Sequence, residues 1–181
     1  DCKAAGKKEF LREAAKLTGV YVPSFYEVSY LPDGKIAAIE PKSGAAFPVI
    51  KRFLPDMDQA FYPKADLVPL TKVVHDRAVL EVMRGCSRGC RFCQAGIIFR
   101  PIREKSPEVL LEQARALLAS SGYDELGLLS LSSADYSCVE PLVDALLAEH
   151  AENGVGVSLP SLRIDAFSVG LADKVQSVRK S

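Results

Sequence analysis

The sequence predicts an α/β fold in two parts: three β/α units in residues 73–181, preceded by a small α+β linker subdomain in residues 1–72. In the second part, three apolar, strand-like runs are each followed by a stretch of helical periodicity. Successive β/α units of this kind form a parallel sheet with right-handed crossovers. In the first part, a helical run precedes short strand-like runs separated by many prolines, which indicates a small antiparallel sheet.

The linker subdomain is expected to hold one helix and three strands. An apolar face recurs at helical spacing over residues 7–17. Residues 25–30 and 35–40 are strand-like and flank Leu31-Pro-Asp-Gly34, a turn sequence whose proline and glycine favour chain reversal. Residues 47–53 are the candidate third strand.

The second part is expected to hold strands at residues 78–84, 126–131 and 155–159. The first strand leads into a loop that is rich in cysteine and arginine. Because parallel β/α folds gather their active groups on the loops after the strands, chemistry is expected there.

Three helices are expected to follow these strands. The first begins at Ser106-Pro107-Glu108, a capping serine with proline at the first helical position, and ends at Gly122. Ser137 and Glu140 have the spacing of a capping box for the second helix. The third helix places Leu171, Val175 and Val178 on one face.

Composition excludes several classes of protein. The chain of 181 residues is 48% hydrophobic and 25% charged, which is typical of a globular domain. Lys plus Arg and Asp plus Glu both number 23, so no global nucleic-acid footprint is expected. No apolar run reaches membrane length, and five cysteines with three in one cluster do not resemble a secreted disulfide framework. We therefore expect a cytoplasmic protein, and because the chain begins at Asp1 without methionine, we expect a fragment.

The most informative feature is the run Cys86-Ser-Arg-Gly-Cys90-Arg-Phe-Cys93, with spacing C-x3-C-x2-C. A cubane iron–sulfur cluster normally takes four thiolates. Three cysteines on one tight loop leave one iron without a protein ligand. An open iron can bind a small molecule and pass an electron to it, which indicates catalysis.

Two alternatives remain open for these cysteines. Cys90 and Cys93 also have zinc spacing, and His75, Cys138 or Asp135 could complete a zinc site in a zinc-stabilised interaction module without catalysis. The same pair could instead be a redox dithiol. Cys2 and Cys138 lie outside the motif, and neither is assigned a role.

The cysteine spacing, Phe92 and the position after the first β/α strand resemble the radical S-adenosylmethionine (radical SAM) superfamily. The stretch from Glu81 to Arg103 is similar to one branch of it, bacterial proteins with an upstream B12-binding-type domain and mostly unassigned substrates. The resemblance implies that the three β/α units are the N-terminal half of a partial TIM-like (β/α) barrel. It also implies that Cys86, Cys90 and Cys93 hold a [4Fe–4S] cluster.

The resemblance carries further implications for cofactors and partners. The fourth iron would chelate the amino and carboxylate groups of SAM, and reductive cleavage of SAM would yield a 5′-deoxyadenosyl radical that acts on an unknown substrate. An electron donor such as a flavodoxin or ferredoxin is expected. Cobalamin is expected only through a domain absent from this chain, which has no Asp-x-His-x-x-Gly motif. The fragment alone is expected to be inactive.

Family members often bind the SAM amino group with a Gly-Gly-Glu-like motif after the second strand. This chain has Ser130-Leu-Ser-Ser-Ala-Asp-Tyr136 instead. By position, Ser132 and Ser133 would accept from the ammonium and Asp135 would add charge complementarity. The alternative is an ordinary loop with Asp and Ser turn chemistry.

The loop after the third strand resembles the stretch that lines the SAM pocket in related branches. Arg163 would bind the methionine carboxylate bidentately, with an ion pair to Asp165 as the alternative. Ser158 and Ser161 would reach the ribose. Phe92 would lie against adenine; a buried packing role is the other interpretation, and both can hold.

Five arginines surround the cysteines: Arg84, Arg88, Arg91, Arg100 and Arg103. They would offset an anionic thiolate cluster or hold a carboxylate or phosphate, and the alternative is an ordinary solvated loop.

Overall fold

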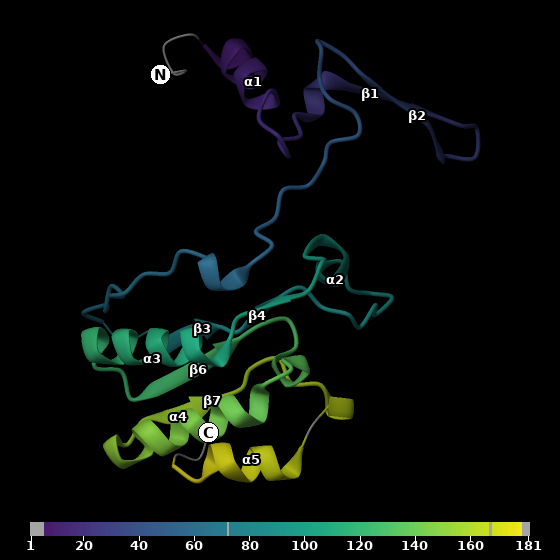
Figure 1. Ribbon diagram of the computed structural model, residues 1–181. Coiled ribbons are helices and arrows are strands. Elements are labelled where there is room, and N and C mark those ends of the chain that lie inside the picture. Colours follow the sequence, from purple (N-terminus) through teal and green to yellow (C-terminus); the bar gives the residue numbers. More distant parts are fainter. Residues whose placement is uncertain (1–5, 72, 167, 179–181) are drawn as a thin grey trace. The chain divides into compact units, whose positions relative to one another are not determined.

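A computed structural model describes residues 6–71, 73–166 and 168–178 (Figure 1). The chain divides into two compact units, Asp1–Leu54 and Pro55–Ser181. This division falls earlier in the chain than the predicted domain boundary at residue 72, which stays a prediction.

The first unit contains a helix and a hairpin. Helix α1 (Lys7–Ala15) is followed by the short 3-10 helix η1 (Pro23–Phe25). Strands β1 (Tyr26–Tyr30) and β2 (Ile36–Pro41) pair antiparallel across the turn that ends at Gly34, where φ is 83°. The predicted helix and the first two predicted strands are therefore confirmed.

The predicted strand over residues 47–53 is wrong, because the described chain forms no strand there. The physical reason lies in Pro48, which has no amide hydrogen to donate to a sheet ladder.

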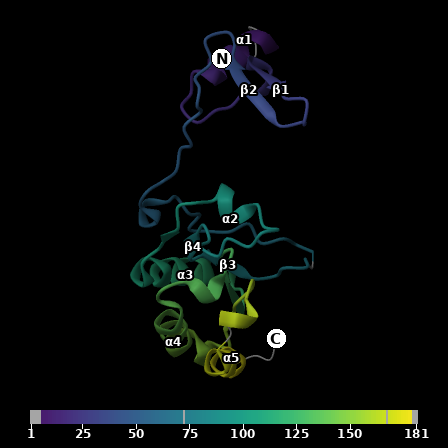
Figure 2. The same ribbon diagram turned by 90° about the vertical axis from the view of Figure 1, so that its right-hand side faces the viewer.

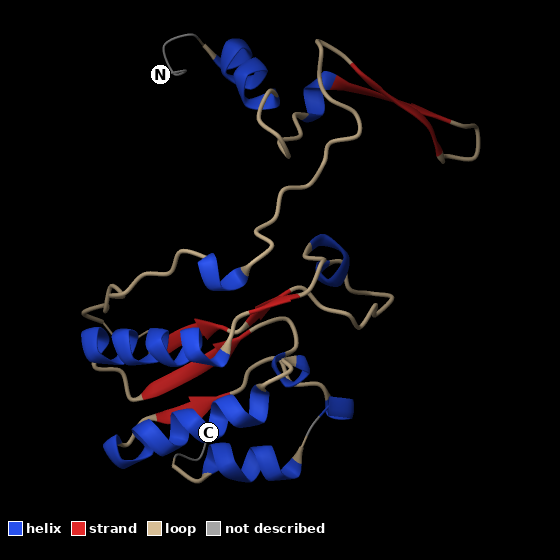
Figure 3. Cartoon of the chain, in the orientation of Figure 1, coloured by secondary structure: helices blue, strands red, loops and turns tan. Residues whose placement is uncertain are grey.

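The second unit is built on a parallel sheet of order β3-β6-β7, shown as red arrows in Figure 3. The strands are β3 (Ala78–Glu81), β6 (Glu125–Leu129) and β7 (Gly156–Ser158), and both pairings are parallel. The predicted parallel sheet is confirmed. The three strands are compatible with a (β/α) fold, and their assignment to the N-terminal half of a partial TIM-like barrel stays a prediction.

Three helices pack against this sheet: α3 (Pro107–Ser121), α4 (Val139–His150) and α5 (Val169–Gln176). Helix α4 lies between α3 and α5 in both views (Figure 1, Figure 2). The core they enclose is apolar and buried: Ala78, Leu80, Val82, Met83, Leu110, Ala114, Leu117, Leu126, Leu128, Tyr136, Leu142, Val143, Leu146, Val155, Val157, Leu171 and Val175.

The ends of α3 follow the prediction, and the start of α4 does not. The Ser106 hydroxyl accepts from Val109 N at 3.4 Å, and Gly122 closes α3 in the left-handed conformation. The predicted capping box at Ser137 is wrong, since the N-cap of α4 is Cys138 without a side-chain cap. The Ser137 hydroxyl is already engaged, because it donates to Glu104 Oε1 at 3.0 Å.

The predicted strand over residues 78–84 is split in two. After β3, the short strand β4 (Met83–Arg84) pairs antiparallel with β5 (Arg103–Glu104). The intervening residues 85–102 are the cysteine loop, which carries the one-turn helix α2 (Ala95–Ile98) and projects beyond β4 (Figure 3). The two ends of this loop are therefore held side by side by backbone hydrogen bonds.

The two faces of the sheet differ in burial within the described residues. Alternating strand residues such as Leu80 and Leu128 are buried toward the helices. Their neighbours Val79 and Leu129 point the other way and are 43% and 48% exposed.

The remaining short 3-10 helices are η2 (Met57–Gln59), η3 (Ser133–Asp135), η4 (Ala151–Asn153) and η5 (Ile164–Ala166). Within the described residues, no helix is both long and apolar enough to cross a membrane.

Candidate functional site

Cys86, Cys90 and Cys93 all lie on the cysteine loop and are free, half-buried thiols. Cys86 comes directly after Gly85, which follows β4, and the Cys93 amide donates to the Cys90 carbonyl at 3.0 Å in a tight turn. The three thiols are thus presented by one short segment that begins at the end of a strand.

Gly85 sets the direction of the loop at its start. Its φ of 98° is one that residues with a side chain rarely adopt. A Cβ at this position would lie 2.8 Å from the Pro101 carbonyl oxygen and 2.9 Å from that of Phe99. Arg103 donates to these same two carbonyls at 3.0 and 3.2 Å. Arg103 is therefore an anchor for the returning arm of the loop.

The central feature of the site is a chain of ion pairs across three loops. Arg88 on the cysteine loop donates from Nε to Asp135 Oδ2 at 2.8 Å and from Nη2 to Oδ1, and Asp135 lies in the loop after β6. Arg88 Nη1 also lies 3.5 Å from Asp165 Oδ2, in the loop after β7. Asp165 accepts from Arg163 Nε and Nη2 at 2.9 and 3.0 Å.

Arg163 returns this chain of contacts to the cysteines. Its Nη1 donates to Cys90 Sγ at 3.2 Å. The ion pair of Arg163 with Asp165 thus coexists with a contact to the cysteine loop. The structure brings Cys90, Asp135 and Arg163 to one strand-end edge.

The charges of this network shift the pKa values of its carboxyl groups. The Arg88 guanidinium holds the pKa of Asp135 below its usual value, and Arg163 does the same for Asp165. Both carboxylates are therefore ionised at neutral pH. The network pairs Arg88 and Arg163 with two carboxylates, and Arg163 also donates to the Cys90 sulfur.

The serines of the second loop have different partners. The Ser133 hydroxyl donates to the Leu128 carbonyl at 2.9 Å, so it is committed to holding the loop. The Ser132 hydroxyl is fully buried and has no hydrogen-bond partner among the described residues. It lies close enough to the Asp135 carboxylate to help lower that pKa, but outside hydrogen-bond geometry. Ser132 is therefore the serine with unused bonding capacity at this edge.

The residues predicted to contact ribose and adenine are not joined to this network. The Ser158 hydroxyl accepts from Arg77 Nη1 at 3.2 Å, and Ser158 is level with Gly127 in the sheet, so β7 ends before its neighbours. Ser161 is exposed with φ 62°. Phe92 lies on the cysteine loop and is 92% exposed, so a buried packing role for it is wrong.

The extra ligands that a zinc site would need are engaged elsewhere. His75 Nδ1 lies 3.0 Å from Arg77 Nη2, Asp135 is paired with Arg88, and Cys138 packs against the core. In the part of the chain that the structure describes, no three His, Cys, Asp or Glu side chains are placed to hold a metal ion, and this includes the three cysteines of the loop. Cys2 lies outside the described residues.

Sequence reasoning did not pair Arg88 with Asp135, which lie 47 residues apart. The available signal was that opposite charges occur in loops after two neighbouring parallel strands. Such loops meet at the same sheet edge.

The comparison with protein families shows to which superfamily the chain belongs. The model of the radical SAM superfamily matches residues 80–180, which include all three cysteines and the three strand-end loops. The chain belongs to the radical SAM superfamily. It is also 28% identical over 141 residues to the uncharacterized protein MJ0966 of Methanocaldococcus jannaschii, which covers 77% of this chain.

The aligned stretch is only 28% of the length of MJ0966. The chain therefore spans less than a third of that relative. Radical SAM membership indicates SAM-dependent radical chemistry, an enzyme, and usually an iron–sulfur cluster. The B12-associated branch stays a prediction.

Proposed function

We propose that Cys86, Cys90 and Cys93 ligate a [4Fe–4S] cluster whose fourth iron is open to SAM. The chemistry of the donor set fits such a cluster: three thiols come from one loop, and no fourth cysteine lies within that loop. The described thiols are not gathered around one point, so cluster loading must draw them together. The observation that carries the proposal is the contact of Arg163 Nη1 with Cys90 Sγ at 3.2 Å. Hydrogen bonds to the ligand sulfurs are among the features by which proteins tune an iron–sulfur cluster.

When bound, the cluster supplies the electron that cleaves SAM to methionine and a 5′-deoxyadenosyl radical. The residues of this chain bind and orient SAM. Arg163 is proposed to bind the methionine carboxylate. Three of the five N–H groups of a guanidinium are used in its contacts with Asp165 and Cys90, so two remain for a ligand.

Asp135 and Ser132 are proposed to bind the methionine ammonium. Asp135 is ionised, and Ser132 has a buried hydroxyl without a partner, so both can accept hydrogen bonds from a cation. Ser133 is proposed to support this loop through Leu128 while facing the same group. Arg88 must share Asp135 with the ammonium, so SAM binding is expected to loosen the Arg88–Asp135 pair.

The adenosine contacts rest on the resemblance alone. Phe92 is proposed to lie against adenine, and its exposed ring is free to do so. Ser158 and Ser161 are proposed to reach the ribose, which for Ser158 means exchanging the contact with Arg77.

The whole protein is proposed to be a cytoplasmic member of the B12-associated branch acting on an unknown substrate. The three β/α units are proposed to be the N-terminal half of its barrel, with residues 1–72 as linker. An electron donor such as a flavodoxin or ferredoxin would reduce the cluster, and cobalamin would enter only through a domain outside this chain. The activity of this chain alone is expected to be low.

Metal and sulfide analysis tests the cluster. After anaerobic reconstitution, the chain is expected to hold about four irons and four sulfides. Cys86→Ala, Cys90→Ala and Cys93→Ala should each abolish loading, whereas the control Cys138→Ala should load normally. Full loading in any of the first three variants contradicts the ligand assignment. Stoichiometric zinc without sulfide in the unmodified chain would favour the zinc-stabilised interaction module instead.

A further inference from the structure

A cavity of about 220 Å³ lies in the second unit, away from the cysteine sulfurs. One wall comes from residues 61–66, another from strand residues of β3 and β6, and a third from α3 and the residue Lys105 that precedes it. The lining is partly polar and partly apolar: Phe61, Tyr62, Pro63, Asp66, Val79, Glu81, Lys105, Gln113, Leu117 and Leu129.

Lys105 brings a nearly unpaired positive charge to this cavity. The residue is only 5% exposed, and its Nζ donates to Gln113 Oε1 at 3.0 Å. Its other close contact is the Tyr62 ring, whose centroid is 5.9 Å away. Among the described residues, no carboxylate lies within ion-pair distance of Nζ. Burial lowers the pKa of Lys105, although the more distant charges of Glu81 and Asp58 act against this. A buried cation whose direct partners are neutral is stabilised when an anion joins it.

Gln113 supplies a second unsatisfied donor in the same place. The residue is 2% exposed, and its Nε2 has no hydrogen-bond partner in the described structure. A buried amide N–H without an acceptor is rare in folded proteins. Gln113 Oε1 already accepts from Lys105 Nζ, so Lys105 Nζ and Gln113 Nε2 lie close together. A negatively charged acceptor between these two donors would bind both of them.

The rest of the lining limits what that acceptor can be. The carboxylates of Glu81 and Asp66 line the same cavity, so they repel a dianion such as phosphate more strongly than a singly charged carboxylate. Glu81 makes its direct ion pair with Arg84, at 2.7 and 2.6 Å, and acts on Lys105 only from a longer distance. Apolar side chains of Leu117 and Leu129 provide a surface for a hydrocarbon part.

We propose that this cavity binds a small organic carboxylate, whose oxygens accept hydrogen bonds from Lys105 Nζ and Gln113 Nε2 and whose carbon chain packs against Tyr62, Leu117 and Leu129. The site does not depend on the proposed iron–sulfur function, because none of its residues is a cysteine or a member of the ion-pair network.

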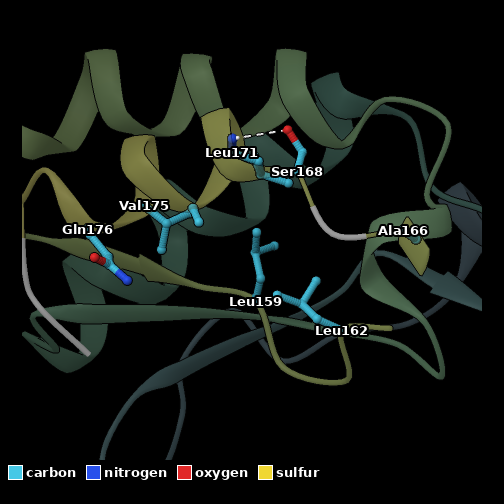
Figure 4. A pocket seen from close by; sticks show the side chains of 8 residues that line it. Leu159, Leu162, Ala166, Ser168, Leu171, Val175 and Gln176 are labelled. Atoms are coloured by element: carbon cyan, nitrogen blue, oxygen red, sulfur yellow. Dashed lines mark hydrogen bonds between the residues drawn. The ribbon is translucent and has the colours of Figure 1, made fainter. Parts of the chain in front are cut away.

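A second pocket, shown in Figure 4, has no charged side chain in its lining and serves as a comparison for the cavity at Lys105. It measures about 140 Å³, and the apolar side chains of Leu159, Leu162, Leu171 and Val175 dominate its lining. Its hydroxyl, that of Ser168, already accepts from Leu171 N at 3.3 Å. No charged side chain lines it, so it selects no ligand chemistry.

Hexanoate, hexan-1-ol and inorganic phosphate are suitable probes for the full chain, with thermal denaturation and saturation-transfer NMR as readouts. Hexanoate is expected to raise the Tm and to give saturation transfer, whereas the uncharged alcohol and the dianion give neither. Lys105→Met is expected to weaken hexanoate binding by about ten- to a hundred-fold, since it removes a charge-assisted hydrogen bond. The matched control Lys42→Met, on an exposed lysine in the first unit, should bind as the unmodified chain does.

Gln113→Glu gives an independent test that keeps the fold. Glutamate at this position would supply the missing carboxylate from within the chain, so the variant is expected to have a higher Tm and no response to hexanoate. The proposal is overturned if the unmodified chain does not respond to hexanoate. It is also overturned if phosphate or hexan-1-ol acts equally well, or if Lys105→Met or Gln113→Glu binds hexanoate undiminished.

Discussion

Replacing Gly85 with alanine is expected to destabilise the second unit and disturb the loop that presents the cysteines. Gly85 has φ 98°, and a Cβ there would lie 2.8 Å from Pro101 O, 2.9 Å from Phe99 O and 3.0 Å from Ile102 Cα. All three are backbone atoms of the returning arm, so no side chain can turn away to make room. The loop must therefore move or the residue must leave its conformation.

The size of the effect follows from two contributions. Holding a residue with a side chain in such a conformation costs about 1–3 kcal/mol. Forcing a methyl group into a closely packed site costs about 1–3 kcal/mol more. The free energy of unfolding should thus fall by about 2–6 kcal/mol, the sum of these two ranges.

Gly122→Ala is the matched control. Gly122 has φ 72° at the end of α3, and a Cβ there would meet nothing within 4 Å. The free energy of unfolding of Gly122→Ala should fall only by the cost of holding alanine in the left-handed conformation, about 1–2 kcal/mol. Urea denaturation of the two variants measures the difference, and iron loading should fall only in Gly85→Ala. Equal destabilisation of the two variants, or normal iron loading in Gly85→Ala, would refute the close packing of the loop.

Three further predictions concern the network, the sheet and pH. Arg163→Gln should lower the reduction potential of the cluster, because the Cys90 sulfur loses a cationic donor that favours the reduced form. The control Arg163→Lys should shift the potential less. An EPR-monitored redox titration that shows no change would mean that the contact is absent in the loaded protein. Leu80→Ala should lower the free energy of unfolding by about 2–5 kcal/mol and the neighbouring Val79→Ala by much less, since only Leu80 is buried; equal losses in urea denaturation would contradict the assignment of sheet faces. Burial raises the pKa of Tyr136 above 10.0, so the unfolded chain releases this proton at a lower pH than the folded chain. The contribution of Tyr136 to the free energy of unfolding is therefore complete below pH 10.0 and should fall as pH rises. Tyr136→Phe should remove this loss of stability at alkaline pH, and it should cost about 1–3 kcal/mol at neutral pH because the Lys105 carbonyl loses its donor.

Local sequence signals predicted the regular elements of the second unit well. The serine and proline at the start of α3, with Gly122 at its end, act through bonds within a few residues of the chain. The three strand-like runs likewise needed only their own apolar side chains to be recognised. The cysteine run was diagnostic for a related reason, since its chemistry depends on spacing within one loop.

Elements that depend on distant partners were not predictable in the same way. The split of residues 78–84 into β3 and β4 arises because β4 pairs with β5 across the cysteine loop, and nothing in the apolar run marks that change of partner. The Arg88–Asp135 pair joins two loops that only the folded sheet brings together. Lys105 and Gln113 are of residue types that are usually exposed, and only tertiary packing buries them.

The EPR spectrum of the reduced, reconstituted chain, recorded with and without SAM, tests the central claim most directly. Reduction should give the signal of a [4Fe–4S] cluster, and SAM should change that signal because it binds the iron that has no cysteine ligand. Arg163→Gln should require more SAM for the same change. A cluster signal that SAM leaves unaltered at any concentration would contradict the proposed open iron.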